Sequence, residues 1–291
     1  MRTYLDCYPC FVRQALDASR NAGASENQQY KVLREVLEAL QGFDKGATPP
    51  EMAYRIHRIV REATGETDPF RAAKDAHTAE ALSLYPRLKT MVAEAQVPLD
   101  MALRVSIAGN ILDVGVSHNY DLEDVIDEVL RDSSVVGEFD AFQDALARAK
   151  QILFLADNAG ETVFDRVLIE ILGRPVTFVV KSGPILNDAT RSEALASGLD
   201  EVATIIESGS DAPGTVLDLC SSDLRQRFAD ADLIIAKGQA NYETLSEKTG
   251  PVFFLLQIKC QVVARDLGLP VKSAVLKRSN HWAPVSFLGV R

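Results

Sequence analysis

Four cysteines are too few to hold a chain of 291 residues together by a disulfide framework, so the protein has to fold around a hydrophobic core. Apolar residues make up 47% of the sequence, which is enough for a substantial core. No run approaches the roughly 20 apolar residues that cross a bilayer. The longest candidate, PVFFLLQI at 251–258, suits a buried strand. These features indicate one large globular domain or two of ordinary size.

Basic residues are also scarce: 31 Lys and Arg stand against 41 Asp and Glu, a formal charge of −10. This balance argues against a nucleic acid or an anionic membrane as the main partner. The N-terminal stretch MRTYLDCYPCFVRQAL lacks the apolar segment of a secretory signal. We therefore expect a cytoplasmic protein without a nucleic-acid or membrane partner.

Residues 1–148 show the periodicity of helices. QQYKVLREVLEALQGF places apolar residues near a 3.6-residue period, and PPEMAYRIHRIVREATG begins with proline and stops at Gly65. AEALSLYPRLKTMVAEAQ, MALRVSIAGNILDVGV and LEDVIDEVLRD continue this pattern. The sequence therefore predicts an all-helical N-terminal domain, residues 1–148.

From residue 149 the pattern changes to short apolar runs separated by helical stretches. The runs are QILFLAD, PVTFVVKS, EVATIIES, ADLIIAKG and PVFFLLQIK. Strands that are apolar throughout and alternate with helices are typical of a parallel sheet covered on both faces. We predict a Rossmann-like three-layer α/β/α domain over residues 149–291, with a mostly parallel sheet of about five or six strands. The tail from Leu269 is a candidate for the extra strand.

Polar residues follow each predicted strand, where ligands of open α/β sheets bind. Asp157 and Asn158 follow the first strand, and Asp188 stands at the next crossing from strand to helix. Either of the first two residues could simply cap the following helix. Two adjacent oxygen-bearing side chains exceed the need of one cap, however, and carboxylate and amide oxygens suit Mg²⁺, Mn²⁺ or a similar ion. The pattern thus predicts a divalent-metal site at Asp157, Asn158 and Asp188.

The phosphate-binding motifs of nucleotide enzymes are missing. DNAGE supplies a single glycine after the first strand, so there is no GxGxxG, and no GxxxxGK[ST] occurs. Lys181, Lys237 and Lys259 stand at strand ends, where solvent exposure is the ordinary interpretation of a lysine. Lys237 lies between an apolar run and Gly238, and its ammonium could neutralise a phosphate.

The helical half offers one matching element. SIAGNILDVGV places Asn110 and Asp113 three residues apart on one face of an apolar helix. The pair could be satisfied inside the helix packing. Alternatively, the helix leans over the mouth of the sheet and adds both side chains to the same cleft, which is the interpretation we favour.

Cysteines and histidines give weaker signals. Cys7 and Cys10 form a single CxxC, which is either structural or half of a soft-metal or redox site. A four-thiolate zinc site would require Cys220 and Cys260 to converge with them. The histidines show no metal-binding spacing, and we interpret His57 and His77 as surface residues of helices.

Four segments together resemble one family. DNAGE after a strand, the Asn-Asp of GPILNDAT, the KGQANYE segment and the GNILD helix are similar to the damage-control phosphatase family (domain of unknown function 89, ARMT1-like). Their arrangement fits as well, with GNILD in the helical half and the other three in the α/β half. DCYPC near the N-terminus and KC at 259–260 resemble its compact prokaryotic branch. The resemblance spans nearly the whole chain.

The resemblance implies a metal-dependent phosphatase that acts on small phosphorylated metabolites, such as sugar phosphates or damaged side products. It implies that Asp157, Asn158 and Asp188 hold the metal, which could be Mg²⁺, Mn²⁺, Co²⁺ or Ni²⁺. By position, the groups around the phosphate and substrate would be Asn110, Asp113, Lys237 and Asn241. Lys237 would act electrostatically, and a metal-bound water is a simpler nucleophile than Asp157.

Two other functions remain open from the sequence. The α/β half could bind S-adenosylmethionine and act as a methyltransferase, although the missing glycine-rich turn speaks against this. The protein could also be a non-catalytic metal-binding protein that uses Cys7 and Cys10.

Overall fold

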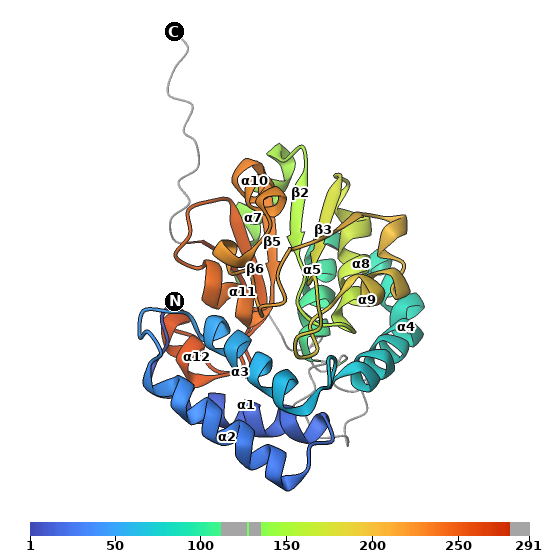
Figure 1. Ribbon diagram of the computed structural model, residues 1–291. Coiled ribbons are helices and arrows are strands. Elements are labelled where there is room, and N and C mark those ends of the chain that lie inside the picture. Colours follow the sequence, from blue (N-terminus) through green and yellow to red (C-terminus); the bar gives the residue numbers. More distant parts are fainter. Residues whose placement is uncertain (112–126, 128–134, 280–291) are drawn as a thin grey trace.

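The N-terminal part of the protein is helical, as the sequence predicts. The computed structural model describes residues 1–111, 127 and 135–279 (Figure 1). Its first elements are α1 (Cys7–Asn21), α2 (Glu26–Gln41), α3 (Pro49–Thr64), α4 (Arg71–Glu94), α5 (Pro98–Ala108) and the 3-10 turn η1 (Gly109–Ile111).

Local sequence sets the ends of these helices, and α3 shows how. Thr48 and Glu51 form a capping box at its start, with the Thr48 amide donating to the Glu51 carboxylate at 2.7 Å. Pro49 occupies the first helical position, where its missing N–H costs nothing. Gly65 ends the helix with φ 75°, a left-handed conformation that glycine adopts without strain.

The rest of the chain forms a sheet with helices between its strands. The strands are β1 (Val136–Gly137), β2 (Ile152–Leu155), β3 (Val176–Val180), β4 (Thr204–Glu207), β5 (Leu233–Lys237), β6 (Val252–Gln257) and β7 (Ala274–Arg278). The helices are α7 (Phe139–Arg148), α8 (Glu161–Leu172), α9 (Arg191–Ala196), α10 (Ser222–Asp230), α11 (Gly238–Leu245) and α12 (Gln261–Leu267), with the short turns η2 (Leu199–Glu201) and η3 (Leu217–Leu219).

The strand order is β1-β7-β6-β5-β2-β3-β4, and all neighbouring pairs are parallel except β6 with β7. The predicted fold class is therefore confirmed: β2 to β6 are the five apolar runs, and the tail supplies β7. The described sheet has seven strands rather than five or six, because β1 adds two residues within the region predicted to be helical. Two residues are too few to show an alternation in the sequence.

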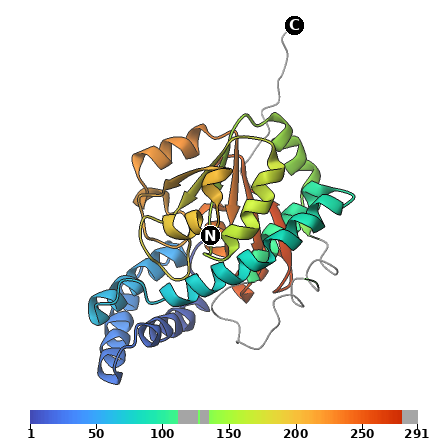
Figure 2. The ribbon, with the colours of Figure 1, turned by 90° about the vertical axis from the view of Figure 1, so that its right-hand side faces the viewer.

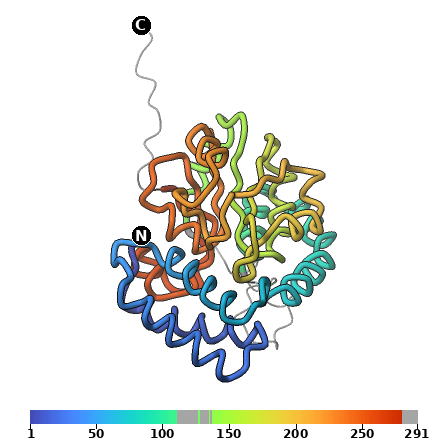
Figure 3. Tube along the Cα trace, in the orientation of Figure 1, coloured from blue at the N-terminus to red at the C-terminus, as the bar shows by residue number. Residues whose placement is uncertain are grey.

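Side chains on the two faces of the sheet enter two hydrophobic cores. In β2, Ile152 and Phe154 join one core, whereas Leu153 and Leu155 join the other. The first core lies under α4, α5, α7 and α8, and the second lies under α1 to α3 and α10 to α12. Figure 2 shows α4 and α8 along one side of the sheet, and Figure 3 shows the N-terminal helices beside the α12 segment. Both cores take side chains from each side of the predicted division at 148/149, which stays a prediction.

The interpretation of His57 as a surface residue was wrong. His57 is 4% exposed, and its ring packs edge-on against Phe70 with 6.4 Å between the ring centroids. The segment 184–186 covers the same side of α3. Periodicity within α3 could not show this second contact surface, because it comes from a distant part of the chain. His77 on α4 is half-buried.

The connections create a switch point in the middle of the sheet. From β2 the chain continues to β3 and β4 on one side, and it then returns through β5 and β6 on the other. β2 and β5 are neighbours in register, with Leu155 opposite Ala236. The turns that follow these two strands therefore lie side by side, which is where ligands bind in open α/β sheets. Within the described residues, no helix is long and apolar enough to cross a membrane.

Candidate active site

The three predicted metal ligands lie together where β2 ends. The segment after β3 runs back along the turn after β2: the Ala189 amide donates to the Asp157 carbonyl at 2.8 Å, and Asn158 pairs with Asp188 as an isolated antiparallel bridge. Asp157, Asn158 and Asp188 are all at least 93% buried. Backbone hydrogen bonds, rather than side-chain contacts alone, thus bring these residues of two different connections together.

Two amide side chains fix the carboxylate of Asp157. Its Oδ2 accepts from Asn110 Nδ2 at 2.8 Å and from Asn158 Nδ2 at 3.0 Å. Asn110 lies in η1 and is fully buried, so the end of the α5 segment does reach the switch point. Its Oδ1 is buried and accepts no hydrogen bond from the described residues. Asp113, its predicted companion, lies outside the described residues.

A buried ionic cluster lies next to Asp157 and Asn110, and we did not predict it from the sequence. Lys237 Nζ lies 2.5 Å from Glu161 Oε1, 2.6 Å from Asp165 Oδ1 and 2.9 Å from the Ser106 carbonyl. Its three N–H donors therefore all have partners in the protein. The other oxygen of Glu161 accepts from Asn110 at 2.9 Å, so the cluster continues to the Asp157 pair.

A signal for this cluster was present in the sequence. Glu161 and Asp165 are four residues apart in α8, on one face of a helix whose residues are mostly buried. Acidic residues at this spacing within an apolar helix need a cation. The sequence does not say which one, because Lys237 is 72 residues or more away.

Burial and charge pairing set the ionisation of the cluster. Burial by itself lowers the pKa of Lys237, but the Asp165 and Glu161 carboxylates outweigh it and hold the pKa above its ordinary value. Burial raises the pKa of Asp165 to about 7, although Lys237 opposes this. Lys237 therefore stays charged, and Asp165 takes up a proton near neutral pH.

Gly238 is required by the close approach of the two turns. Its φ is +77°, and a Cβ at this position would lie 1.8 Å from Asp157 Oδ2. Any larger residue would push the carboxylate out of place.

Asn241 of α11 holds the same turn from behind. It donates to the carbonyls of Lys237 at 2.8 Å and Ala156 at 3.2 Å, and it accepts from Thr215. Its amide thus ties the end of β5 to the end of β2.

Lys181 is the cation beside Asp188. It is 5% exposed, its ammonium donates to the Gly214 carbonyl, and it lies 3.5 Å from Asp188 Oδ2. That distance is longer than a good charge-assisted hydrogen bond. The ammonium therefore has a loose ionic contact at the edge of the site.

The donor set of the site fits a hard divalent cation. Two buried carboxylates and an amide are oxygen ligands of the kind that Mg²⁺ and Mn²⁺ prefer. Asn158 uses its Nδ2 on Asp157 and Glu161, at 3.0 and 3.1 Å. None of its hydrogen bonds to the described residues uses Oδ1, which is the atom a cation would take.

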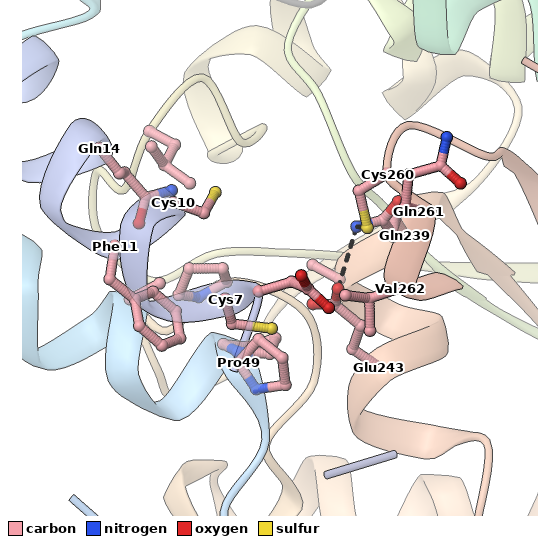
Figure 4. Close-up of a pocket in the computed structure, with 16 residues that line it drawn as sticks. Cys7, Cys10, Phe11, Gln14, Pro49, Gln239, Glu243, Cys260, Gln261 and Val262 are labelled. Atoms are coloured by element: carbon pink, nitrogen blue, oxygen red, sulfur yellow. Dashed lines mark hydrogen bonds between the residues drawn. The ribbon is translucent and has the colours of Figure 1, made fainter. Parts of the chain in front are cut away.

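A cavity of about 420 Å³ lies beside the carboxylates rather than at them. Cys7, Cys10 and Cys260 line it, together with Gln239 and Glu243 of α11 (Figure 4). Three of the four cysteines thus share one cavity, whereas Cys220 does not line it. Burial raises the pKa of Glu243 to about 7, which its hydrogen bond from Gln239 and the N-terminal ammonium offset only in part.

Comparisons with known proteins show which proteins this chain is similar to. The family model for the damage-control phosphatase ARMT1-like domain matches residues 3–275. A damage-control phosphatase of Archaeoglobus fulgidus is 35% identical over 93% of this chain and 97% of its own length. The damage-control phosphatase of Pyrococcus horikoshii is 30% identical over 96% and 99%, respectively.

A solved structure shares the fold. The crystal structure of a protein of the domain of unknown function 89 family from Pyrococcus horikoshii superposes with a TM-score of 0.88 and 29% sequence identity. The match covers 96% of this chain and 100% of the other.

Proposed function

Because the chain belongs to the family of damage-control phosphatases with an ARMT1-like domain, we propose that it is a metal-dependent phosphatase of small phosphorylated metabolites. Its substrates are phosphomonoesters, either sugar phosphates or damaged and side-product phosphometabolites. The metal is Mg²⁺, Mn²⁺, Co²⁺ or Ni²⁺, and its ligands are Asp157, Asn158 and Asp188.

One observation carries the proposal: two carboxylates and an amide are buried together at the switch point between β2 and β5. Ligands of open α/β sheets bind at this place, and burying carboxylates is costly unless hydrogen bonds or a cation compensate their charge. The hydrogen bond from Ala189 to Asp157 and the pairing of Asn158 with Asp188 hold these groups in position before any ligand arrives.

The side chains around the site orient one another. Asn110 and Asn158 both donate to Asp157 Oδ2, which fixes the plane of that carboxylate. When bound, the cation would supply Lewis-acid polarisation of the phosphoryl oxygens and orient a water for attack. Asn110 Oδ1 is buried and accepts no hydrogen bond from the described residues. It is therefore suited to accept a hydrogen bond from a substrate hydroxyl.

Two lysines have different roles in this proposal. Lys237 holds Glu161 and Asp165 and has no N–H left for a phosphate, so its effect on the reaction is to position Glu161 and, through it, Asn110. Lys181 is the cation that meets the phosphoryl group, since its contact with Asp188 is a loose 3.5 Å. Asn241 positions the turn after β5, and Asp113 stays a predicted substrate contact.

Phosphate release tests the proposal. The purified protein is incubated with a panel of sugar phosphates and each of the four metals, with and without chelator. We expect metal-dependent release, and a loss of about 100-fold or more in Asp157→Asn and Asp188→Asn. Asp200→Asn is the matched control, because Asp200 is an exposed carboxylate of η2. It should keep wild-type activity.

The outcomes separate the alternatives. If no metal and substrate pair yields phosphate, the protein is not a phosphatase of this kind. Release that survives chelation and both ligand substitutions would show catalysis at another place. Saturable binding of S-adenosylmethionine without phosphatase activity would favour the methyltransferase instead.

A further inference from the structure

The cysteine cavity has no part in the proposed active site, and its lining is unusual. Cys7 and Cys10 are one helical turn apart at the start of α1, and Cys260 immediately precedes α12. Figure 4 shows the three thiols around one space, with Glu243 of α11 between them. Elements from opposite ends of the sequence thus bring three sulfur atoms and a carboxylate to one cavity.

These thiols form no disulfide in the described structure, and the Cys7 thiol has a hydrogen bond with the backbone of Tyr4. All four cysteines are free rather than in disulfides. Cys260 is the residue before α12, yet its side chain makes no capping hydrogen bond to that helix. Its sulfur accepts a long contact from Gln239 Nε2 at 3.5 Å, and the same Nε2 donates to Glu243 Oε1 at 2.9 Å. Gln239 therefore links the carboxylate and the third thiol.

A redox or nucleophilic use of the thiols fits less well. Reactive thiols have a lowered pKa, usually from a nearby cation. Here burial raises the pKa of Cys7 and of Cys10, and the neighbouring Glu243 carboxylate adds to the increase. Thiols clustered with an acid are instead the donor set of a soft metal, in which the metal replaces their protons.

We propose that Cys7, Cys10, Cys260 and Glu243 bind a thiophilic divalent cation, Zn²⁺, which fastens α1 to α11 and α12. Three sulfur ligands and one oxygen give the four donors of a closed structural zinc site. Within the described residues, no three His, Cys, Asp or Glu side chains already surround one point. Binding would therefore require the thiols to turn toward a common point by rotation about χ1. Each releases its proton to solvent, and no oxidation state changes.

The ion would cross-link two parts of the fold that share a core but lie far apart along the chain. α1 carries two ligands, and α11 begins at Gly238, the residue packed against Asp157. A ligand that binds only the folded chain stabilises it by an amount that grows with the logarithm of its concentration once that concentration exceeds Kd. Zinc should therefore raise the melting temperature, whatever the activity of the protein.

The experiment starts from protein freed of metal by chelation and kept reduced. Zn²⁺ should bind at about one equivalent per chain and raise the melting temperature. Co²⁺ serves as the spectroscopic probe, because thiolate ligation gives a near-ultraviolet charge-transfer band that oxygen ligands do not. Cys10→Ser is the first variant, since Cys10 is exposed and its replacement leaves the core intact. It should lose the band and more than about tenfold in zinc affinity, because even indirect partners of a metal contribute about 10–100-fold.

Two further variants make the assignment specific. Cys260→Ser should behave like Cys10→Ser, whereas Cys220→Ser should keep the band and the affinity. Cys220 is the matched control, a buried thiol that donates to the Val216 carbonyl outside the cavity. Asp157→Asn should leave the cobalt band unchanged, so failure of the phosphatase proposal and failure of this one are told apart.

Several results would overturn the proposal. They are the absence of the band in the wild type, a band that persists in Cys260→Ser, or a zinc-induced thermal shift of equal size in Cys10→Ser. A stoichiometric disulfide between Cys7 and Cys10 in protein isolated without reductant, together with no zinc affinity after reduction, would assign the cluster to redox chemistry.

Discussion

Replacing Lys237 by methionine tests whether the ammonium is the counter-ion of a buried acidic cluster. Lys237 and Glu161 are fully buried, Asp165 is 1% exposed, and the two carboxylates lie 2.5 and 2.6 Å from Nζ. Methionine fills a similar volume without the charge. Removing one partner of a buried ion pair costs about 3–5 kcal/mol, because the remaining charges are left uncompensated. A typical domain is stable by only about 5–15 kcal/mol, so this loss is large.

The loss should depend on pH. Burial raises the pKa of Asp165 to about 7, and Lys237 is the main group that lowers it, so the variant has a higher pKa still. The folded variant then binds a proton at a pH where the unfolded chain does not. Because the wild-type Asp165 already takes up its proton near pH 7, the stability of the variant relative to the wild type recovers as pH falls through the variant's higher pKa to about 7, and it is lost as pH rises.

Urea denaturation at about pH 7 and at about pH 9, followed by circular dichroism, measures the effect. Lys150→Met is the control: Lys150 is exposed, and its replacement should change stability by less than about 0.5 kcal/mol. Adding Asp165→Asn to Lys237→Met should recover part of the loss, since it removes one buried charge. A loss below about 1 kcal/mol, or one that does not vary with pH, would refute the reasoning.

Three further predictions follow from single positions. Gly238→Ala should lower the unfolding free energy by about 1–2 kcal/mol, because its backbone is left-handed, and should abolish most phosphatase activity by displacing Asp157. The control is Gly173→Ala, which has φ +62° and open space at its Cβ; it should lower stability without changing activity. Burial lowers the pKa of His57 to about 3, so stability should fall as pH drops below about 6.5, by about 2 kcal/mol at pH 5. His57→Leu should lack this decrease of the unfolding free energy between about pH 6.5 and about pH 5. Urea titrations that show the same pH dependence for the wild type and the variant would contradict the prediction. Glu161→Gln should weaken Mn²⁺ binding by about 10–100-fold in a calorimetric titration, because Glu161 orients Asn158. An unchanged affinity would show that Glu161 does not orient a metal ligand.

The sequence predicted the elements well where one physical signal was enough. The five runs that became β2 to β6 are apolar on both faces, because each strand is covered by helices on both sides. In the same way, Asp157, Asn158 and Asp188 stand out because polar side chains directly after buried strands are uncommon unless they cap or bind something. The structure places these three together, and Asn110 beside them. Whether they hold a metal stays a prediction.

Contacts between distant segments are what the sequence could not supply. Glu161 and Asp165 were visible as acids in an apolar helix, but only the packing of β5 against β2 identifies Lys237 as their cation. Similarly, the covering of His57 depends on a segment more than 100 residues further along the chain.

By itself, the sequence determined the fold class, the order of the elements and the polar residues at the strand ends, since these follow from local periodicity and local composition. The tertiary structure alone decided which charges are neutralised and which thiols meet. The spacing of Cys260 in the sequence does not pair it with Cys7 and Cys10, yet it shares a cavity with them because α1 and α12 pack into the same core. The packing of whole helices and strands decides which distant residues meet. The spacing of residues along the sequence does not contain this information.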